Sequence, residues 1–452
     1  MAQRQQVLLE MVKRLIRRDA SPSLSNLLSK SHPVDVAHLF HDLERHEQRI
    51  LFELISDPEM SGTVLSELDP EVSAQLLENL NKEQIVTILD EMANDDAVDV
   101  IQTLPESLAE EILQLMEDEY SQEIEQLLQY DEDTAGGIMS TDIFSLSEEM
   151  TVREAIDAIQ QAEDVEMVFY LYVTDVSHNH LVGVLSLRKL LTVSPTKTLG
   201  EIMVRDVISV RTDVDQEEVA RIVEKYNILA IPVVNETNKL MGVITVDDVI
   251  DVIRAEATED IYKMAGASDE ELLLGYRSFL IARLRLPWLL TNLLGGVATG
   301  FLMWKFRVTL EAVIALITFI PVITGMGGNV GAQSATIVVR GFATGRIDFS
   351  SIRRVIYREL RVGIIMGAVC GCVVGVIAYA WHGNPYLGLV VGMAMIFAIT
   401  VAAAMGVIAP AFFNRIGVDP AIAAAPFVQT ANDITGILIY FGTATFFLEL
   451  LK

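Results

Sequence analysis

Five long apolar stretches near the end of the chain constrain its fold more than any other feature. They cover residues 286–306, 312–339, 362–381, 386–413 and 421–448. Each contains the roughly 20 mostly apolar residues that a membrane-spanning helix requires. Pro321 and the glycine-rich run Gly325–Gly331 interrupt the second stretch, so we expect a broken span there, and the fourth should end near Pro410. Residues 276–452 are therefore predicted to form a transmembrane domain with five helices.

The charge of the chain is divided between its two ends. Residues 277–452 carry 6 acidic and 13 basic residues, whereas residues 1–276 carry 56 acidic and 20 basic residues, a net charge of −36. Such an excess argues against nucleic acid as a partner and favours cations, although an acidic surface that only maintains solubility has the same composition. Residues 1–19 are basic and amphipathic but have no apolar core for a signal peptide, so we expect the acidic part to stay in the cytosol.

The basic residues of the predicted loops indicate an orientation. Ten of the thirteen lie before the first span, between the second and third, or between the fourth and fifth, and three lie on the opposite side. Because an excess of Lys and Arg marks cytoplasmic loops, the N-terminus is predicted inside the cell and the C-terminus outside.

The third stretch contains Gly363, Gly367, Gly371 and Gly375 at intervals of four residues. They line one face of a helix, and small residues at this spacing allow a second helix to approach closely. We expect a packing face, although glycine is common in membrane helices in general.

Asp433 is the only acidic residue well inside a predicted span, because the other acids of this region, Glu359 among them, lie near span ends and can reach water. A carboxylate at this depth costs at least a few kcal/mol unless water or a cation compensates it. Gln429 lies one turn earlier, and the second stretch supplies Asn329. Oxygen ligands with few charges suit a hard, partly hydrated cation such as Mg²⁺. The alternative is a structural carboxylate bonded to a neighbouring threonine.

An internal repeat occupies residues 137–253. "GIMSTDIFSLSEEMTVREAIDAI" matches "EIMVRDVISVRTDVDQEEVARIV" at an offset of 64, and each unit predicts a strand, a helix, two further strands and a helix. The pattern resembles a tandem pair of α/β CBS domains, which sense adenine nucleotides or ions, and we assign them residues 134–199 and 200–246. The resemblance implies a ribose-binding Asp after a Ser or Thr. Thr245 and Asp248 provide it in the second repeat, the candidate ATP site, whereas the first repeat has Lys189 at the matching place.

Residues 35–118 repeat on a period of twelve residues. A large apolar residue precedes a short polar turn at Leu68, Leu80, Met92, Leu104 and Met116. Candidate N-caps are Asp69, Asn81 and Asn94. The period predicts short stacked helices, so residues 1–133 are expected to form an all-α superhelical domain, for which a generic scaffold is the alternative to a functional role.

Acidic residues gather in two segments of this soluble part. Residues 247–275 are predicted to form a connecting helix that carries Asp248, Asp251, Glu256, Glu259 and Asp260. Like charges so placed repel unless a cation bridges them to another surface, although a solvated helix is the alternative. The N-terminal domain contributes Asp95, Asp96 and Asp99, and the second CBS repeat contributes Glu217, to this candidate cytosolic metal site.

The order of these parts resembles the MgtE family of magnesium channels. The segments "PVITGMGGNVGAQSAT" and "GVDPAIAAAPFVQTANDITGILIYF" carry the resemblance, which extends over nearly the whole chain. It implies a homodimer in the bacterial inner membrane with a Mg²⁺-selective pore between the second and fifth spans. It also implies that intracellular Mg²⁺ neutralises the cytosolic acids and holds the channel shut, with the connecting helix as the plug.

Residue by residue, the resemblance places Asp433 at the pore carboxylate that binds hydrated Mg²⁺ and Asn329 at the first Asn of the Gly-Gly-Asn stretch. The chain departs from the family pattern at Ala332, where many members have Asn, and at Gln429 and Ala425, near the pore entrance. These departures concern transport rate and cation preference rather than the Asp433 site.

Two other functions fit the same residues. One is a divalent-cation exchanger, and the other is a membrane-anchored CBS sensor without transport, although one span would be enough for an anchor. The sequence contains no P-loop, HExxH motif or nucleophile triad, so an enzyme is not expected.

Overall fold

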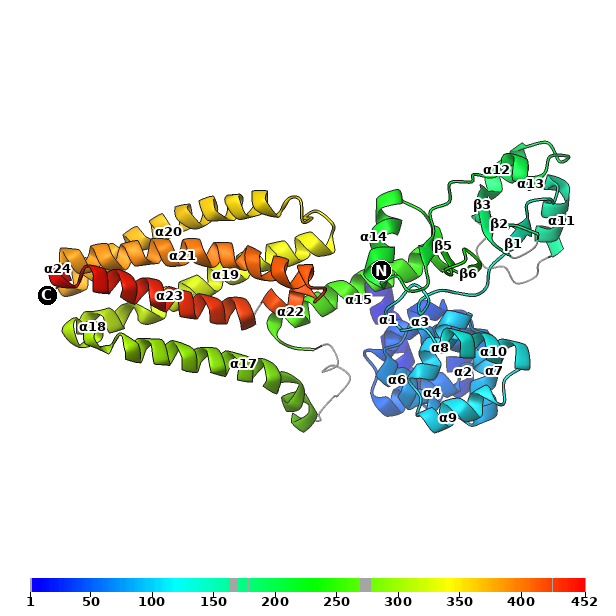
Figure 1. The fold of residues 1–452 in the computed structure, drawn as a ribbon. Helices are drawn as coiled ribbons and strands as arrows, with labels where there is room; N and C mark the ends of the chain where they lie inside the picture. The colour runs from blue at the N-terminus through cyan, green and yellow to red at the C-terminus, as the bar shows by residue number, and fades with distance from the viewer. Residues whose placement is uncertain (1, 162–169, 177–178, 269–277, 425, 452) are drawn as a thin grey trace. The chain divides into compact units, whose positions relative to one another are not determined.

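The structure is a computed structural model that describes residues 2–161, 170–176, 179–268, 278–424 and 426–451 (Figure 1). The chain divides into two compact units, Met1–Ile253 and Arg254–Lys452. The first unit contains short helices and two small sheets, and the second contains helices joined by short loops in its described residues. Each unit has an apolar core of its own.

Short helices form the first half of the first unit. They are α1 (Ala2–Ile16), α2 (Ser21–Leu28), α3 (Pro33–Phe40), α4 (Arg45–Glu53), α5 (Pro58–Ser66), α6 (Pro70–Leu77), α7 (Lys82–Leu89), α8 (Asn94–Gln102), α9 (Glu106–Leu113) and α10 (Asp118–Leu127). Helices of this length are not stable alone in water, so they depend on a shared core. The twelve-residue period is confirmed, because Leu68, Met92, Leu104 and Met116 are buried in that core and Leu80 packs against it.

The three predicted N-caps have different outcomes. Asn81 forms a capping box with Gln84 at the start of α7, as predicted. Asp69 occupies the N-cap position of α6, but its side chain makes no capping hydrogen bond. For Asn94 the prediction was wrong: Ala93 is the N-cap residue of α8, and the Asn94 side chain is buried. Its Nδ2 atom makes a tertiary contact, described below, whereas the Oδ1 atom that a cap would use is buried without a donor among the described residues.

The internal repeat is confirmed by two equivalent sheets. The first repeat comprises β1 (Ser145–Ser147), α11 (Val152–Gln161), β2 (Tyr170–Thr174), β3 (Leu181–Ser186), α12 (Leu187–Thr192) and α13 (Leu199–Ile202). The second comprises β4 (Val210–Arg211), α14 (Gln216–Tyr226), β5 (Ala230–Val234) and β6 (Leu240–Thr245). In each sheet a parallel pair precedes an antiparallel pair, and the register shifts at Val173/Thr174 and at Val233/Val234. The next helix, α15 (Val246–Ala265), begins in the first unit and ends in the second.

The second unit is a bundle of long apolar helices. Its elements are α17 (Ser278–Lys305), α18 (Arg307–Ala312), the 3₁₀ helix η1 (Ile314–Phe319), α19 (Ile320–Ala343), α20 (Ile352–His382), α21 (Pro385–Arg415), α22 (Pro420–Ala424), α23 (Pro426–Phe446) and α24 (Leu448–Leu451). Four helices in the described chain are long and apolar enough to cross a membrane: α17, η1 with α19, α20 and α21. The fifth predicted span, α23, carries polar residues in its first half but packs lengthwise against α19 and α21.

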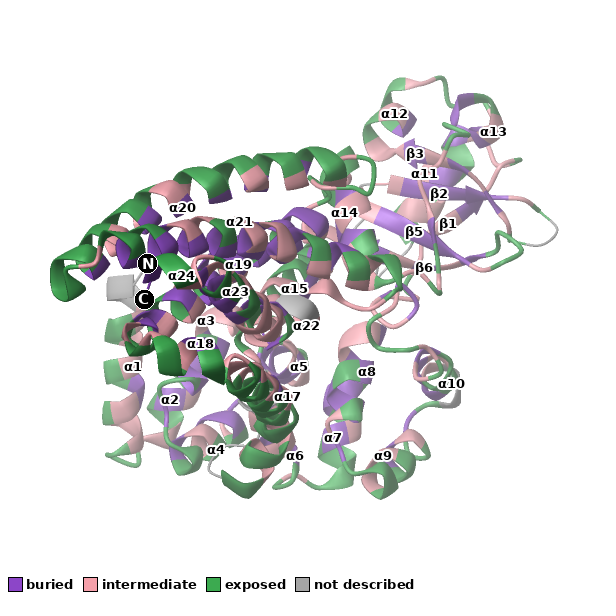
Figure 2. Ribbon diagram, turned by 60° about the vertical axis from the view of Figure 1, so that its left-hand side comes forward, coloured by how far each residue is buried: buried purple, intermediate pink, exposed green. Residues whose placement is uncertain are grey.

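Burial differs sharply within this bundle. In Figure 2 the outward sides of α17 and α20 are exposed, whereas α21 is buried along much of its length. The exposed side chains include large apolar residues such as Leu294, Val376 and Trp381. Apolar side chains that point away from the protein are expected for helices surrounded by lipid.

The predicted glycine face of α20 is confirmed, and its partner is α21 of the same chain. A Cβ atom on Gly371 would lie 2.5 Å from the Gly392 carbonyl oxygen, and one on Gly375 would lie 2.8 Å from that of Gly388. Backbones this close leave no room for a side chain, so the spacing of small residues determines the pairing of these helices.

The predicted interruptions are confirmed only in part. The second span changes from the 3₁₀ helix η1 to α19 just before Pro321, which lies in the first turn of α19, where its missing N–H costs no hydrogen bond. Residues Gly325–Gly331, in contrast, do not break α19 and continue as helix. Helix α21 continues past Pro410 to Arg415. Within a membrane the backbone groups must be bonded by protein, which favours unbroken helix over exposed loop.

Candidate functional site

Acidic side chains from α8 and α15 face each other in the first unit. Asp95, Asp96 and Asp99 lie on α8, and Asp248 and Asp251 lie in the first turns of α15. Burial raises the pKa of Asp95 to about 8, with Asp248 and Asp96 adding negative charge. Burial also raises the pKa of Asp99 to about 6, with Glu132 and Asp248 contributing. Asp99 keeps more solvent contact, so Asp95 is the stronger candidate for protonation near neutral pH.

Asp248 also caps its own helix. Its Oδ2 atom accepts hydrogen bonds from the Thr245 backbone N–H at 3.1 Å and from the Thr245 hydroxyl at 2.5 Å. These hydrogen bonds lower the pKa of Asp248, but burial raises it by more, and the charges of Asp247 and Asp251 add to the increase. The pair predicted to hold a ribose is therefore engaged in helix capping, and the charge of Asp248 also acts on Asp95 and Asp99 of the acidic cluster.

Asn94 is the residue of this cluster that sequence reasoning misplaced. Its Nδ2 atom lies 3.0 Å from Glu123 Oε2, 2.6 Å from Thr141 Oγ1 and 3.3 Å from Asp142 Oδ1. The amide thus joins α8 to α10 and to the segment that leads into the first CBS repeat. Because these partners lie 29 to 48 residues away, no local pattern marks them.

Two oxygen atoms of the cluster are buried without a hydrogen-bond donor among the described residues. They are Oδ1 of Asn94 and Oδ1 of Asp95, on consecutive residues. A buried acceptor without a partner costs roughly 1–3 kcal/mol, and a hydrated cation is one species that would satisfy both. Among the described residues, no three His, Cys, Asp or Glu side chains are grouped as direct ligands of one metal ion. An ion held here would therefore have to keep some of its water, as Mg²⁺ commonly does.

The other predicted sensor residues lie elsewhere. Glu217 is on α14 and pairs with Arg221 at 3.0 Å. Glu256, Glu259 and Asp260 lie in the part of α15 that belongs to the second unit and are half-buried there. The structure thus groups five of the nine predicted acids, those of α8 and the first turns of α15, and separates four.

The end of α15 is held by an ion-pair network within the second unit. Lys263 Nζ lies 2.5 Å from Glu259 Oε1 and 2.8 Å from Asp419 Oδ2. The other oxygen of Asp419 accepts the Ala421 N–H at the start of α22. Met264 packs against a buried cluster formed by Ala335, Val339, Ala421 and Val428. The connecting helix therefore ends against α19, α22 and the first turn of α23.

Helices α19 and α23 carry the polar residues predicted for a pore. Gly331 contacts Val428 and Asn432, and Ile323 approaches Gly436, so the two helices run antiparallel. Asn329 and Gln429 are exposed, and Asp433 is half-exposed. Because Gln429 and Asp433 are four residues apart on α23, they share one face of that helix. Ala332, one of the departures, is half-buried on α19, and Ala425 lies outside the described residues.

Asn432 locks these two helices together. Its side chain is 1% exposed, and its Nδ2 atom donates to the Gly327 carbonyl oxygen at 3.3 Å. It occupies the space beside Gly331, where a Cβ atom would lie 1.8 Å from Nδ2. Likewise, Gly328 makes room for Gln429, and Gly295 of α17 makes room for Thr430. The glycines therefore accommodate the polar segment of α23.

A second polar contact joins α19 to α20. The Ser334 hydroxyl donates to Glu359 Oε2 of α20 at 2.9 Å, and Arg358 Nε donates to Glu359 Oε1 at 3.1 Å. Glu359 is 5% exposed, so the prediction that it reaches water was wrong. Helix α20 begins ten residues before the predicted span, which draws Glu359 into the bundle. Its partner Ser334 is on another helix, and sequence spacing gives no signal of that pairing.

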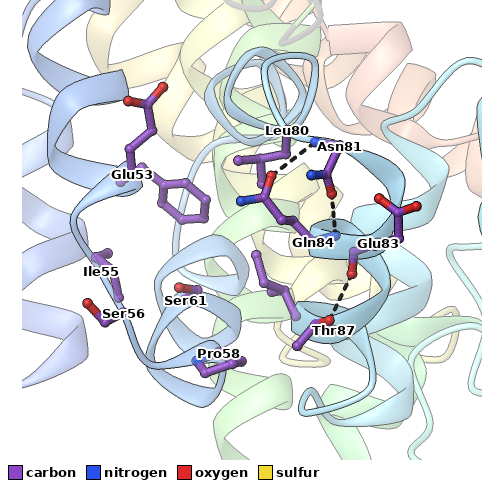
Figure 3. A pocket seen from close by; sticks show the side chains of 12 residues that line it. Glu53, Ile55, Ser56, Pro58, Ser61, Leu80, Asn81, Glu83, Gln84 and Thr87 are labelled. Carbon is purple, nitrogen blue, oxygen red and sulfur yellow. Dashed lines mark hydrogen bonds between the residues drawn. The ribbon is translucent and has the colours of Figure 1, made fainter.

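The N-terminal helices also form a groove of about 400 Å³, lined by α4, α5 and α7 (Figure 3). Its polar lining includes Asn81 and Gln84, which cap each other, and Thr87, whose hydroxyl donates to the Glu83 carbonyl. These groups stabilise the first turns of α7, so the groove presents few uncommitted polar atoms and we assign it no function.

Comparison with known proteins agrees with this arrangement over most of the chain. A family described as the MgtE divalent cation transporter matches residues 320–443, the MgtE intracellular N domain matches 31–133, and the CBS domain matches 135–195 and 199–255. Two relatives named magnesium transporter MgtE, from Thermus thermophilus and Bacillus subtilis, are 41% and 40% identical over 325 and 323 residues, 71% of each chain. The chain belongs to the MgtE family.

Two solved structures resemble the soluble part. The cytosolic domain of the Mg²⁺ channel MgtE in complex with ATP is 34% identical, with a TM-score of 0.52, and covers 54% of this chain and 99% of its own. The soluble part of a magnesium transporter is 31% identical, with a TM-score of 0.50, and covers 56% and 99%. The MgtE relatives are named as transporters rather than enzymes, and the predicted fold class is confirmed: a helical N domain, a CBS pair and a multi-pass membrane bundle.

Proposed function

We propose that this MgtE family member is a Mg²⁺ channel that cytosolic Mg²⁺ closes. The observation that carries the proposal is the pair of donor-less buried oxygens, Asn94 Oδ1 and Asp95 Oδ1, in a cluster of like-charged carboxylates. Such a cluster is costly without a cation and favourable with one, so Mg²⁺ binding stabilises the compact arrangement of α8 and α15. The relatives' names, and the match to a divalent cation transporter, support Mg²⁺ as the transported ion.

The ion path runs beside α19 and α23. Asp433 provides the charge, and Asn329 and Gln429 provide neutral oxygens on a face that this chain leaves partly exposed. A second copy related by a two-fold axis would cover that face and place two carboxylates around one hydrated ion. This supports a homodimer in which each subunit contributes half of the pore.

Helix α15 transmits the closing signal. Its first turns carry Asp248 and Asp251, and its last turn is held against the pore helices through Lys263, Asp419 and Met264. An ion that fixes the first turns against α8 restrains the whole helix, because a continuous helix transmits a displacement along its length. Loss of Mg²⁺ restores the repulsion and raises the open population.

The remaining assignments follow the predicted topology. We place the protein in the inner membrane of a bacterium, with the acidic unit in the cytosol and the C-terminus outside, as the basic loops indicate. ATP binding at the CBS pair is a further proposal, supported by the ATP complex of the related cytosolic domain. Asp248 already accepts two hydrogen bonds from Thr245. A nucleotide ribose and a Mg²⁺ ion would therefore compete for the same carboxylate.

Patch recording from membranes that contain the protein, with cytosolic Mg²⁺ stepped, tests the proposal. A channel gives unitary Mg²⁺ currents whose open fraction falls as cytosolic Mg²⁺ rises. An exchanger, the alternative, gives no unitary steps and needs a counter-ion gradient. Currents that are insensitive to cytosolic Mg²⁺ would retain the channel and exclude the sensor. No Mg²⁺ flux by any assay would leave only a membrane-anchored sensor.

A further inference from the structure

Helix α1 presents an exposed face unlike the rest of the first unit. Residues 1–18 carry five basic residues and one acidic residue, whereas residues 19–276 carry 55 acidic and 15 basic residues. The matched family N domain begins only at residue 31, so α1 and α2 precede it. A basic element placed before a strongly acidic domain requires an explanation of its own.

One face of α1 is used by the core of the unit. Val12 is fully buried, and Leu8, Leu9, Leu15 and Ile16 pack against the same core. This face anchors α1 to the domain, so its orientation is determined and the opposite face is necessarily turned outward. The helix is therefore not a loose tail.

The outward face combines apolar and basic side chains. Val7 is 53% exposed and Met11 is 45% exposed, and Arg14, Arg17 and Arg18 are exposed as well. Residues 7, 11 and 14 recur at intervals of four and three, which places them on one side of α1, and Arg17 and Arg18 follow in the turn directly after the helix. We call Val7, Met11, Arg14, Arg17 and Arg18 the basic stripe.

The arginines of the basic stripe are unpaired in a domain rich in acids. Within the described residues, none of the three takes part in an ion pair or donates a side-chain hydrogen bond. Beside the stripe lies a hollow of about 350 Å³, whose lining includes Val7, Met11 and Lys30. The acids nearby are Glu10 on α1, Asp19 directly after Arg18 and Asp35 in the hollow, against five basic residues in 1–18 and Lys30, so positive charge still prevails.

We propose that the basic stripe docks on an anionic lipid bilayer surface. Arginines beside exposed apolar side chains suit the boundary between charged headgroups and acyl chains. Nucleic acid fits less well, because it offers no apolar phase for Val7 and Met11 and because the acids of the domain would repel a long polyanion. The chain carries its own membrane helices, so the surface is available to α1 at a high effective concentration and even a weak contact is populated.

The test uses the full-length protein in lipid nanodiscs. In a background with Cys370→Ser and Cys372→Ser, Val7→Cys carries a polarity-sensitive fluorophore. Discs of phosphatidylcholine alone are compared with discs that also contain phosphatidylglycerol. We expect a blue shift only with the anionic lipid, and its reversal by high salt, because surface attraction is screened within a Debye length.

A charge-matched pair of variants locates the effect. Arg14→Gln, Arg17→Gln and Arg18→Gln together should lower the docked-to-free ratio roughly 100-fold, at roughly fivefold for each arginine. Arg205→Gln, Lys225→Gln and Lys239→Gln remove the same charge from other exposed sites and should leave the shift intact. Circular dichroism checks that both variants are folded.

Three results would overturn the proposal. An equal shift in both kinds of disc would mean that the stripe does not respond to lipid charge. A shift that survives the triple substitution in α1 would assign it to another contact, such as a second copy of the chain. A shift that appears only when RNA is added to protein in neutral discs would assign the stripe to nucleic acid.

Discussion

The acidic cluster of α8 and α15 differs from the polar face of α19 and α23, formed by Asn329, Gln429 and Asp433, in how far its polar atoms are hydrogen-bonded. In the cluster, carboxylates face one another and two buried oxygens have no donor. Behind the polar face, Asn432 Nδ2, Ser334 and Glu359 are hydrogen-bonded within the chain, and one oxygen, Asn432 Oδ1, is buried without a donor among the described residues. The region that we propose to respond to an ion is left with more electrostatic strain, and the region that we propose to guide an ion is mostly supported by bonds within the chain. The following experiments, from the largest expected effect to the smallest, test this contrast.

Replacement of the one charge on the polar face should have the largest effect. Asp433→Asn keeps the size of the side chain but removes the charge, so Mg²⁺ uptake and Mg²⁺-dependent growth of a transport-deficient host should be abolished. Glu311→Gln, an exposed acid of α18 in the same unit, is the matched control and should retain uptake. Normal uptake by Asp433→Asn would remove the pore assignment.

Neutralisation of the acidic cluster should uncouple the protein from cytosolic Mg²⁺. For the wild type, Mg²⁺ at 100 times its Kd should stabilise the folded state by about 2.7 kcal/mol. In Asp95→Asn with Asp99→Asn and Asp248→Asn, this shift in thermal unfolding should disappear, and uptake at high internal Mg²⁺ should rise. Glu110→Gln with Glu125→Gln and Glu224→Gln changes the net charge equally at exposed positions and should behave as wild type. An unchanged Mg²⁺ response in the cluster variant contradicts the sensor.

A pair of substitutions can test the contact between Gly331 of α19 and Asn432 of α23. Gly331→Ala places a methyl group against Asn432 Nδ2 and should destabilise the bundle by about 1–3 kcal/mol, with slower uptake. Asn432→Ala in the same chain should recover part of that loss, since the two sites are in contact. Gly300→Ala on α17 is the control, because an added Cβ would meet no atom of the other described elements within 4 Å. Strictly additive effects on thermal unfolding would refute the contact.

Proton release should accompany Mg²⁺ binding, with the smallest effect of the four. Asp95 and Asp99 have folded-state pKa values of about 8 and about 6, above their ordinary value. The folded state therefore holds protons that the unfolded state has lost, so without Mg²⁺ its stability should fall as pH rises from about 4 to 8.

Mg²⁺ competes with those protons, so its apparent affinity should increase from pH 6 to pH 8. Thermal unfolding with and without Mg²⁺ at both pH values measures this. Asp95→Asn should weaken the pH dependence, and an affinity that is equal at both pH values would argue against protonated acids in the site.

Sequence patterns predicted what depends on local periodicity. The helices on a twelve-residue period, the duplicated sheets and the glycine face of α20 all follow from which residues must be buried at regular intervals. Prediction was wrong where a partner is distant. Asn94 was expected to cap α8 and instead joins Glu123, and Glu359 was expected to reach water and instead binds Ser334. Composition suggested that glycine would break α19, whereas packing against α23 uses the same glycines within a helix.

The close contact of α20 and α21 limits where this bundle can deform. Backbone meets backbone at Gly371 and Gly375, so no rotamer change can absorb a displacement between the two helices. They should behave as a single rigid body. Helix α17, by contrast, has Gly295 as its one fully buried described residue. Gly406 of α21 approaches the Gly331 carbonyl oxygen of α19 equally closely, which adds this part of α19 to the frame. Any movement that alters the proposed passage beside Asp433 should therefore take place at α17 or α23, while α20 and α21 remain fixed.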